Sequence, residues 1–340
     1  MNSEKRVNFT AYLVTPLMTL FGFTVASLVF TFILKEPAPV PVFIIFAVIQ
    51  IVCMSLFAIL PKKGKIIARL ISMVFIGLFL LVLAGIMGRT NFQLEGFFFY
   101  LTTGTLSGVM IHFIMGKLVG PIVFSRSWCS WSCWTGMILD LLPYKENTSW
   151  KKGVAPNIRY IHFSISLALV AILFYGFKYT ILHTDKVEMA KGIGTVTELT
   201  WFIVGNISYY TIGIILALIM KDNRAFCKYI CPVTIFLRTT NRITLTRIKG
   251  DQERCTDCGT CVKKCPMGIN ISQYVQLGER VKSTECILCM NCVANCPEGI
   301  LKSSVGFDFA TKDYLIRDLP VSELGRSNPD PFKKTGSKVS

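Results

Sequence analysis

Long runs of apolar residues, nearly free of charged side chains, restrict this chain more than any other feature. Only 16% of its 340 residues are charged, whereas a typical soluble domain has about 25%. A helix needs about 20 apolar residues to cross a hydrocarbon core about 30 Å thick. The sequence therefore predicts about six membrane spans, at residues 9–34, 40–60, 70–87, 97–115, 158–182 and 199–220.

The basic residues are concentrated in loops that share one side of the predicted membrane topology. These loops hold Lys5, Arg6, Lys62, Lys63, Lys65, Arg69, Lys117, Arg126, Lys145, Lys151, Lys152 and Arg159. Because basic loops stay in the cytoplasm, we expect a multi-pass protein of the cell inner (cytoplasmic) membrane with both termini cytoplasmic. Contacts with anionic headgroups account for the net charge of +16. No nucleic-acid partner is expected, because no recognition motif accompanies the charge.

Twelve of the thirteen cysteines fall into four tight groups. Two groups, at residues 255–266 and 286–297, follow the pattern C-x2-C-x2-C-x3-C-P, which is the spacing of bacterial ferredoxins. The first three cysteines wrap one cluster as a loop, and the fourth, before the proline, reaches the other cluster. The sequence therefore predicts two [4Fe-4S] clusters, one bound by Cys255, Cys258, Cys261 and Cys296, the second by Cys286, Cys289, Cys292 and Cys265.

Zinc and disulfides are the alternatives for these thiols. Zinc also accepts four thiolates, and cysteines of small secreted chains form disulfides. Two complete tandem copies, each ending in Cys-Pro, favour iron–sulfur clusters over zinc. Tight grouping in a long polytopic chain favours metal ligands over disulfides.

Two further cysteine pairs lie where predicted spans meet the cytoplasm. Cys129 and Cys133 form one C-x3-C pair, and Cys227 and Cys231 form the other. On a helix this spacing places both sulfurs on one face, so four thiolates could hold an additional Fe–S or other metal centre. The alternative is that both pairs are buried small residues or loop thiols without a metal.

The three histidines allow weaker hypotheses. His112 and His162 are predicted near the cytoplasmic ends of their spans, and His183 near an outer end. Haem ligation by His112 and His162 and a hydrogen bond to a quinone headgroup are both chemically open. Interfacial histidines without a cofactor are commoner, so a quinone enters only as a candidate ligand.

The predicted fold class is mainly α. It is a polytopic membrane helix bundle followed by a cytoplasmic, bacterial-type 2[4Fe-4S] ferredoxin-like α+β module. The predicted domains are a transmembrane helical domain with the first cysteine pair at 1–220, a membrane-edge connector with the second pair at 221–250, the ferredoxin-like module at 251–305 and a C-terminal tail at 306–340.

Three segments in this order resemble the NapH/NosR type of membrane polyferredoxin. They are residues 126–140 (RSWCSWSCWTGMILD), residues 224–233 (RAFCKYICPV) and the tandem ferredoxin signature, so the resemblance covers roughly residues 97–304. The family includes quinol-dehydrogenase subunits, which pass electrons between the quinone pool or cytoplasmic donors and a partner redox protein. This chain departs from the pattern at Trp134, where a proline commonly follows the second cysteine, and in its larger number of predicted spans.

The expected function is that of a membrane-bound iron–sulfur electron-transfer subunit. It would relay electrons between a quinone pool or cytoplasmic donor and a partner redox protein or flavoprotein. No acid–base pair, nucleophile motif or phosphate loop indicates a self-contained catalytic site, so we expect a component of a membrane oxidoreductase rather than a complete enzyme. The alternative, a redox-linked regulatory or metal-centre maturation protein, would be expected to carry an additional sensing or flavin domain.

Overall fold

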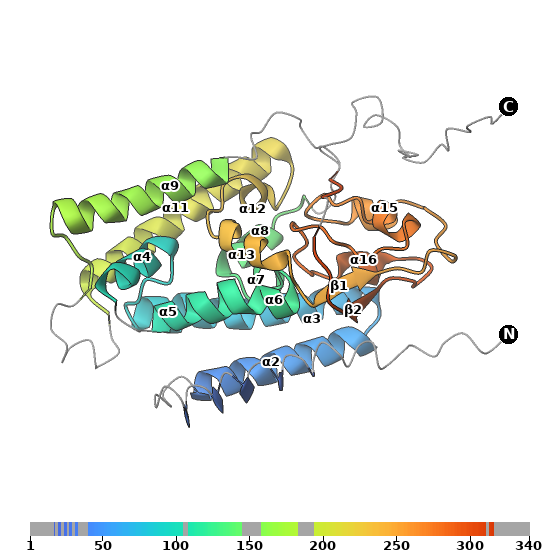
Figure 1. Cartoon of the computed structure of the whole chain (residues 1–340), viewed down its shortest axis with the longest axis horizontal. Helices are drawn as coiled ribbons and strands as arrows, with labels where there is room; N and C mark the ends of the chain where they lie inside the picture. Colours follow the sequence, from blue (N-terminus) through green and yellow to red (C-terminus); the bar gives the residue numbers. More distant parts are fainter. Residues whose placement is uncertain are drawn as a thin grey trace.

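The computed structural model describes residues 40–104, 108–144, 158–182, 194–310 and 313–315, together with scattered positions between 17 and 32. A bundle of long helices occupies one end of the molecule, and a module of short helices and two strands occupies the other (Figure 1). Several short helices lie between these two parts. The predicted mainly helical fold is confirmed.

Three α-helices of the bundle, α3, α5 and α9, are continued by π-helical segments. In chain order the elements are α2 (Val40–Ile59), α3 (Lys62–Leu78), η2 (Phe79–Met87), α4 (Leu94–Thr103), α5 (Gly108–Phe113), η3 (Ile114–Val119), α6 (Gly120–Phe124), α9 (Ile158–Ala171), η4 (Ile172–Gly176) and α11 (Val196–Met220). The short helices between the bundle and the module are α7 (Trp128–Trp131), α8 (Trp134–Asp140), α12 (Ala225–Tyr229) and α13 (Thr234–Asn241).

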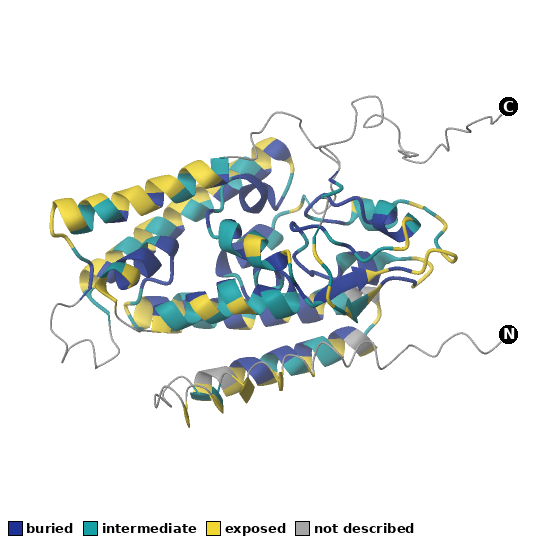
Figure 2. Cartoon of the chain, in the orientation of Figure 1, coloured by how far each residue is buried: buried dark blue, intermediate teal, exposed yellow. Residues whose placement is uncertain are grey.

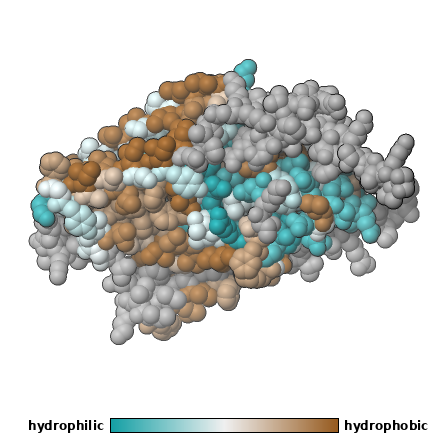
Figure 3. Space-filling model, turned by 45° about the horizontal axis from the view of Figure 1, so that its top comes forward, coloured by the Kyte–Doolittle hydropathy of each residue, from teal (hydrophilic) through white to brown (hydrophobic). Residues whose placement is uncertain are grey.

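Three helices of the described part are long and apolar enough to cross a membrane, namely Gly64–Met87, Ile158–Gly176 and Val196–Met220. The apolar helices Ile44–Phe57 and Gly108–Phe124 are shorter. Many large apolar side chains of α9 and α11 are exposed (Figure 2), as expected of helix faces that contact lipid. Apolar surface covers much of the bundle and hydrophilic surface covers much of the module (Figure 3). The surface of the bundle is therefore suited to contact lipid, and that of the module to contact water.

The described helices do not reproduce all six predicted spans. The span predicted at residues 9–34 lies largely outside the described residues. The span predicted at residues 97–115 is wrong as a single helix, because α4 ends at Thr103, Gly104 is left-handed (φ 64°) and the next described helix, α5, begins at Gly108. A left-handed glycine ends a helix at little cost, and hydropathy does not detect that conformation.

The module is built around its cysteines. Strands β1 (Thr246–Lys249) and β2 (Lys302–Val305) form an antiparallel pair, and the helices are α14 (Thr260–Lys263), α15 (Ile271–Gln276) and α16 (Asn291–Asn295). The buried core combines apolar residues such as Ile248 and Tyr274 with cysteines, and it continues into the bundle through Trp131 and Phe57. Because a small module buries little apolar surface, it usually needs a metal or another cross-link for stability.

Candidate metal centres

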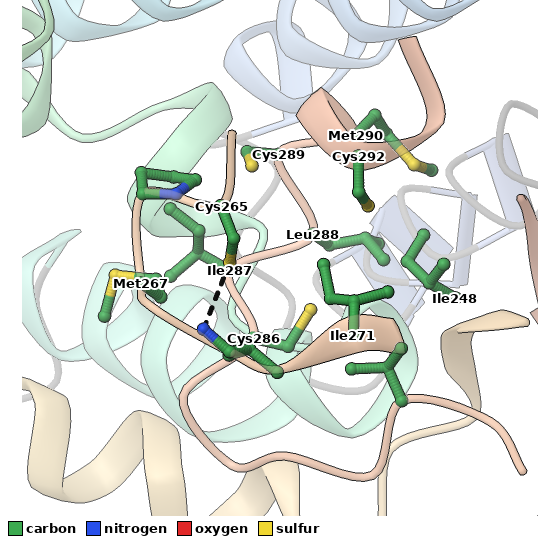
Figure 4. A pocket seen from close by; sticks show the side chains of 13 residues that line it. Ile248, Cys265, Met267, Ile271, Cys286, Ile287, Leu288, Cys289, Met290 and Cys292 are labelled. Carbon is green, nitrogen blue, oxygen red and sulfur yellow. Dashed lines mark hydrogen bonds between the residues drawn. The ribbon is translucent and has the colours of Figure 1, made fainter. Parts of the chain in front are cut away.

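Four cysteines line one cavity of the module, and we call them the inner quartet. They are Cys265, Cys286, Cys289 and Cys292. Figure 4 shows their side chains around a common space that is otherwise lined mainly by apolar residues such as Ile271 and Leu288. The backbone N–H of Ile269 donates to Cys265 Sγ at 3.5 Å. Cys265 belongs to the first cysteine motif and the other three to the second, which is the crossed arrangement expected from the spacing.

A second cavity is lined by the other four cysteines of the module, which we call the outer quartet. They are Cys255, Cys258, Cys261 and Cys296. Cys258 is exposed, and its Sγ lies 3.4 Å from Thr260 Oγ1. Hydrogen bonding to Thr260 lowers the pKa of Cys258 below its ordinary value. The outer quartet therefore contains the exposed cysteine of the module.

The two cysteine loops share an unusual backbone conformation. Asp257 (φ 52°) and Gly259 (φ 69°) flank Cys258, and Leu288 (φ 47°) and Met290 (φ 60°) flank Cys289. Left-handed non-glycine residues cost about 1–3 kcal/mol each and gather at ligand-binding loops. The repeated strain indicates that both loops are shaped to hold a ligand.

The two quartets fit a cluster better than a single ion. Among the described residues, no three His, Cys, Asp or Glu side chains are close enough to hold one metal ion. Zinc requires four sulfurs at about 2.3 Å from one point, whereas a cubane spreads its thiolates over a wider space. The spacing of the described cysteines therefore favours a cluster over a single zinc ion.

Burial favours the protonated form of three of these thiols. It raises the pKa of Cys286 to about 11 and that of Cys261 and Cys265 to about 12. A cysteine binds iron as the thiolate, so metal binding has to displace these protons. These three buried cysteines would therefore become charged when they bind a metal.

The two C-x3-C pairs come together beside the bundle, and we call these four cysteines the membrane-edge quartet. Cys129 lies in α7 and Cys133 caps α8, while Cys227 lies in α12 and Cys231 follows it. The predicted placement of each pair on one helix face is wrong, because a helix ends inside each pair. Cys227 and Cys231 nevertheless interact electrostatically with both cysteines of the other pair. The structure therefore brings all four thiols into one neighbourhood.

Sequence reasoning missed the basic residues around the membrane-edge quartet, although a repeat pointed to them. Residues 126–133 (RSWCSWSC) and 224–231 (RAFCKYIC) share the pattern Arg-x-aromatic-Cys-x-aromatic-x-Cys. The two arginines of this repeat, Arg126 and Arg224, are at most 1% exposed. Nη1 of Arg224 donates to the carbonyl of Cys129 in the other copy at 2.9 Å and lies 3.9 Å from Cys227 Sγ. Each copy of the repeat thus supplies two thiols and one buried arginine.

Buried basic side chains outnumber buried acidic ones at this interface. Those at most 5% exposed are Arg69, Lys117, Arg126, Arg159, Arg224 and Lys228. The carboxylates that pair with five of them are Asp140, Asp222 and Glu285. The interpretation of Arg69, Lys117, Arg126 and Arg159 as loop charges beside the headgroups is therefore wrong. Because buried unpaired charge is costly, the surplus indicates an anionic group at the same place, and a [4Fe-4S] core with four thiolates is anionic.

Hydrogen bonds join the membrane-edge quartet to the loop of the inner quartet. Ser130, next to Cys129, donates its hydroxyl to the carbonyl of Ile287 at 2.6 Å, and the indole N–H of Trp131 donates to the carbonyl of Leu288 at 3.0 Å. Both carbonyls lie between Cys286 and Cys289. The bundle therefore contacts the module at the inner quartet.

An ion cluster around Glu285 strengthens the same contact. Its carboxylate lies 2.6 Å from Arg126 and 3.2 Å from Arg159, and Arg238 is at 3.3 Å. Burial opposes ionisation of Glu285, but the three arginines outweigh it and lower its pKa to about 2. Glu285 thus remains charged at physiological pH and holds helices from several parts of the chain beside Cys286.

The described histidines have separate neighbours. The His112 ring lies 4.8 Å from the Trp128 ring, and its Nε2 is buried without a hydrogen-bond partner among the described residues. His162 Nδ1 lies 3.0 Å from the carbonyl of Ile230, and its ring lies 5.7 Å from that of Tyr209. His183 lies outside the described residues. These contacts single out His112 as the histidine with an unused polar atom.

Two protein families match parts of the chain. A 4Fe-4S dicluster domain matches residues 247–297, which contain the inner and outer quartets. A 4Fe-4S binding domain matches residues 106–150 and again residues 210–249. Each of these last two segments holds one C-x3-C pair. The chain therefore carries 4Fe-4S ferredoxin-type domains in both of its parts.

Several distant relatives match about half of the chain. An uncharacterized protein of Methanocaldococcus jannaschii is 26% identical over 171 residues, which cover 50% of this chain and 63% of that protein. YccM of Escherichia coli, whose name describes it as an electron transport protein, is 24% identical over 206 residues, covering 55% and 54%. The methylamine utilization ferredoxin-type protein MauN of Methylobacillus flagellatus is 24% identical over 165 residues, covering 44% and 54%.

The matched regions span less than two thirds of the length of each of these three relatives. No solved structure matches the chain. The ferredoxin-type domains and the relatives named for electron transport support an electron-transfer role.

Proposed function

We propose that this chain is a membrane-bound iron–sulfur subunit that relays electrons between a soluble redox partner or flavoprotein and a quinone, as in the NapH/NosR type that it resembles. It would lie in the cell inner membrane with the module and both termini in the cytoplasm. The ferredoxin-type domains and the relatives named for electron transport support the electron-transfer role. The arrangement of the three cysteine quartets supports a relay through several iron–sulfur sites.

In this proposal each quartet binds one [4Fe-4S] cluster. Such clusters, when bound, supply one-electron transfer at potentials set by their surroundings. The membrane-edge cluster has its own support, because each segment matched by the 4Fe-4S binding domain contains only two cysteines and a cubane takes four thiolates. Neither segment suffices alone, and the fold brings the two pairs together.

The main observation behind the proposed order of the sites is a hydrogen bond. The hydroxyl of Ser130 donates to the carbonyl of Ile287, which links the chain beside Cys129 directly to the chain between Cys286 and Cys289. This contact supports a proposed route in which the inner quartet lies between the membrane-edge quartet and the outer quartet. A soluble partner would then approach the outer quartet, where Cys258 is exposed.

Buried polar atoms near the membrane-edge quartet favour a quinone as the reactant from the membrane. His112 Nε2, Trp128 Nε1 and the Tyr210 hydroxyl are buried, and no described group hydrogen-bonds to them. Tyr210 interacts electrostatically with Cys133. A quinone headgroup presents carbonyl oxygens that accept hydrogen bonds from such groups, which would compensate for their burial.

Cysteine variants test this proposal. Cys258→Ser, Cys289→Ser and the double variant Cys129→Ser/Cys231→Ser remove ligands from the outer, inner and membrane-edge quartets respectively. Each should lower the iron content by about four atoms per chain, change the low-temperature EPR spectrum and slow electron transfer to an added quinone. Cys53→Ala, which removes the isolated cysteine of α2, is the control and should leave iron and EPR unchanged. Wild-type iron content and spectrum in the double variant would show that the membrane-edge quartet binds no cluster.

A further inference from the structure

Lys117 differs from the other buried cations of the interface. It lies in η3, it is 5% exposed, and its Nζ lies 3.8 Å from the centre of the Trp128 ring. The other five buried cations pair with carboxylates, for example Arg126 with Glu285 and Arg224 with Asp140. In the described part of the chain no carboxylate pairs with Lys117. A cation–π contact compensates for only part of what burial of an ammonium costs.

The membrane-edge quartet is the group that Lys117 faces. Its ammonium interacts electrostatically with Cys133, Cys129 and Cys231. Arg126 and Arg224 approach the same quartet and interact with Cys227, but their charge is shared with Glu285 and Asp140. Lys117 is therefore the buried cation of this interface whose charge no described carboxylate balances, so its charge can compensate that of the thiolates.

The backbone around Lys117 also has an uncommon conformation. Lys117 lies within a π-helical segment, Ile114–Val119, in the middle of the apolar helix Gly108–Phe124. Single π turns inside α-helices occur frequently at functional sites. A lysine in a largely apolar helix is costly unless it has a role or an anionic partner.

We infer that Lys117 is a positioning residue that sets the reduction potential of the membrane-edge centre. This inference rests on the proposed function, because it requires a cluster on the membrane-edge quartet. When that centre takes up one electron from the inner site, its negative charge increases by one, and no bond forms or breaks. A nearby ammonium at low dielectric stabilises the added charge, so it makes the centre easier to reduce.

The test is an EPR-monitored redox titration of the purified full-length protein with its clusters. Lys117→Met should lower the midpoint potential of the membrane-edge centre, with a change of at least about tenfold in its reduction equilibrium, or about 59 mV for one electron. Lys117→Arg should keep the potential near the wild-type value. The clusters of the module provide the internal control and should not shift.

Lys65→Met is the matched control, because Lys65 also places its ammonium over an aromatic ring, 5.3 Å from the centre of Phe57. It should leave the potential of the membrane-edge centre unchanged. An equal shift in this control would overturn the inference, since any lost cation near the membrane would then have the same effect.

The remaining outcomes separate the inference from the function on which it rests. Full iron content with an unchanged potential in Lys117→Met overturns the role of Lys117 alone. Absence of a third centre from the wild-type protein overturns the proposed function. If Lys117→Met fails to assemble the centre, Lys117→Arg decides: retention of the centre supports the need for a charge, and its loss shows that Lys117 acts only by packing.

Discussion

Arg224 stands where the membrane-edge quartet, the inner quartet and the bundle meet. Its guanidinium donates to the carbonyl of Cys129, and its Nη2 lies 2.7 Å from Asp140, which Arg69 also contacts at 2.9 Å. It interacts electrostatically with Cys289 of the inner quartet as well. One side chain therefore adjusts the charge at two of the three proposed centres.

Arg224→Gln should destabilise the protein and deplete the membrane-edge centre of iron. Removing one partner of a buried ion pair costs about 3–5 kcal/mol, because the other charge remains buried. Thermal unfolding in detergent and iron analysis measure the two effects. The double variant Arg224→Gln/Asp140→Asn should recover part of the stability, since it removes both charges. No recovery would indicate that Arg224 stabilises through its contact with Cys129 rather than through Asp140.

At the scale of elements, the close approach of α8 to α7 and to the Arg224 side chain brings the two copies of the repeat together. Gly136 in α8 makes this approach possible, because an added Cβ would lie 2.7 Å from Nη1 of Arg224 and 2.9 Å from the carbonyl of Cys129. The backbone N–H of Gly136 also donates to Cys133 Sγ at 3.4 Å. A small residue is therefore required at the junction of the two repeats.

Gly136→Ala should displace Arg224 and weaken the membrane-edge centre, with little effect on the module. Forced overpacking of this kind typically costs about 1–3 kcal/mol. Gly108→Ala is the control, because an added Cβ there meets nothing within 4 Å. The EPR signals of both variants compare the outcomes. An unchanged membrane-edge signal in Gly136→Ala would mean that the two repeats do not pack as closely as described.

The grouping of cysteines in the inner and outer quartets could be predicted because local spacing defines the ferredoxin motif. The grouping of Cys265 with Cys286, Cys289 and Cys292 around one cavity follows from residues within a short stretch of chain. The break at Gly104 and the burial of Lys117 were not predictable from hydropathy. Hydropathy detects neither a single left-handed residue nor a cation that is compensated by a distant part of the chain.

At the scale of the whole molecule, membrane orientation remains a prediction. Arg69, Lys117, Arg126 and Arg159 counted toward the positive-inside bias, but they are buried at the interface between bundle and module. These four residues therefore cannot be counted as loop charges that report topology alone. The remaining bias still predicts that the module lies in the cytoplasm.

Reporter fusions test this orientation. A reporter after Ser340 should report the cytoplasm, and one within residues 185–194 should report the exterior. A cytosol-active reporter such as a fluorescent protein and an exterior-active phosphatase form the matched pair at each position. An exterior location for Ser340 would overturn the proposed route from a cytoplasmic partner.

We propose above all that the chain holds three four-cysteine iron–sulfur centres, with the inner quartet between the membrane-edge quartet and the outer quartet. Anaerobic analysis of iron, acid-labile sulfide and zinc in the purified wild-type protein tests it most directly. We predict about twelve iron and about twelve sulfide per chain, with no stoichiometric zinc. About eight iron would restrict the clusters to the module, and zinc without labile sulfide would contradict the account.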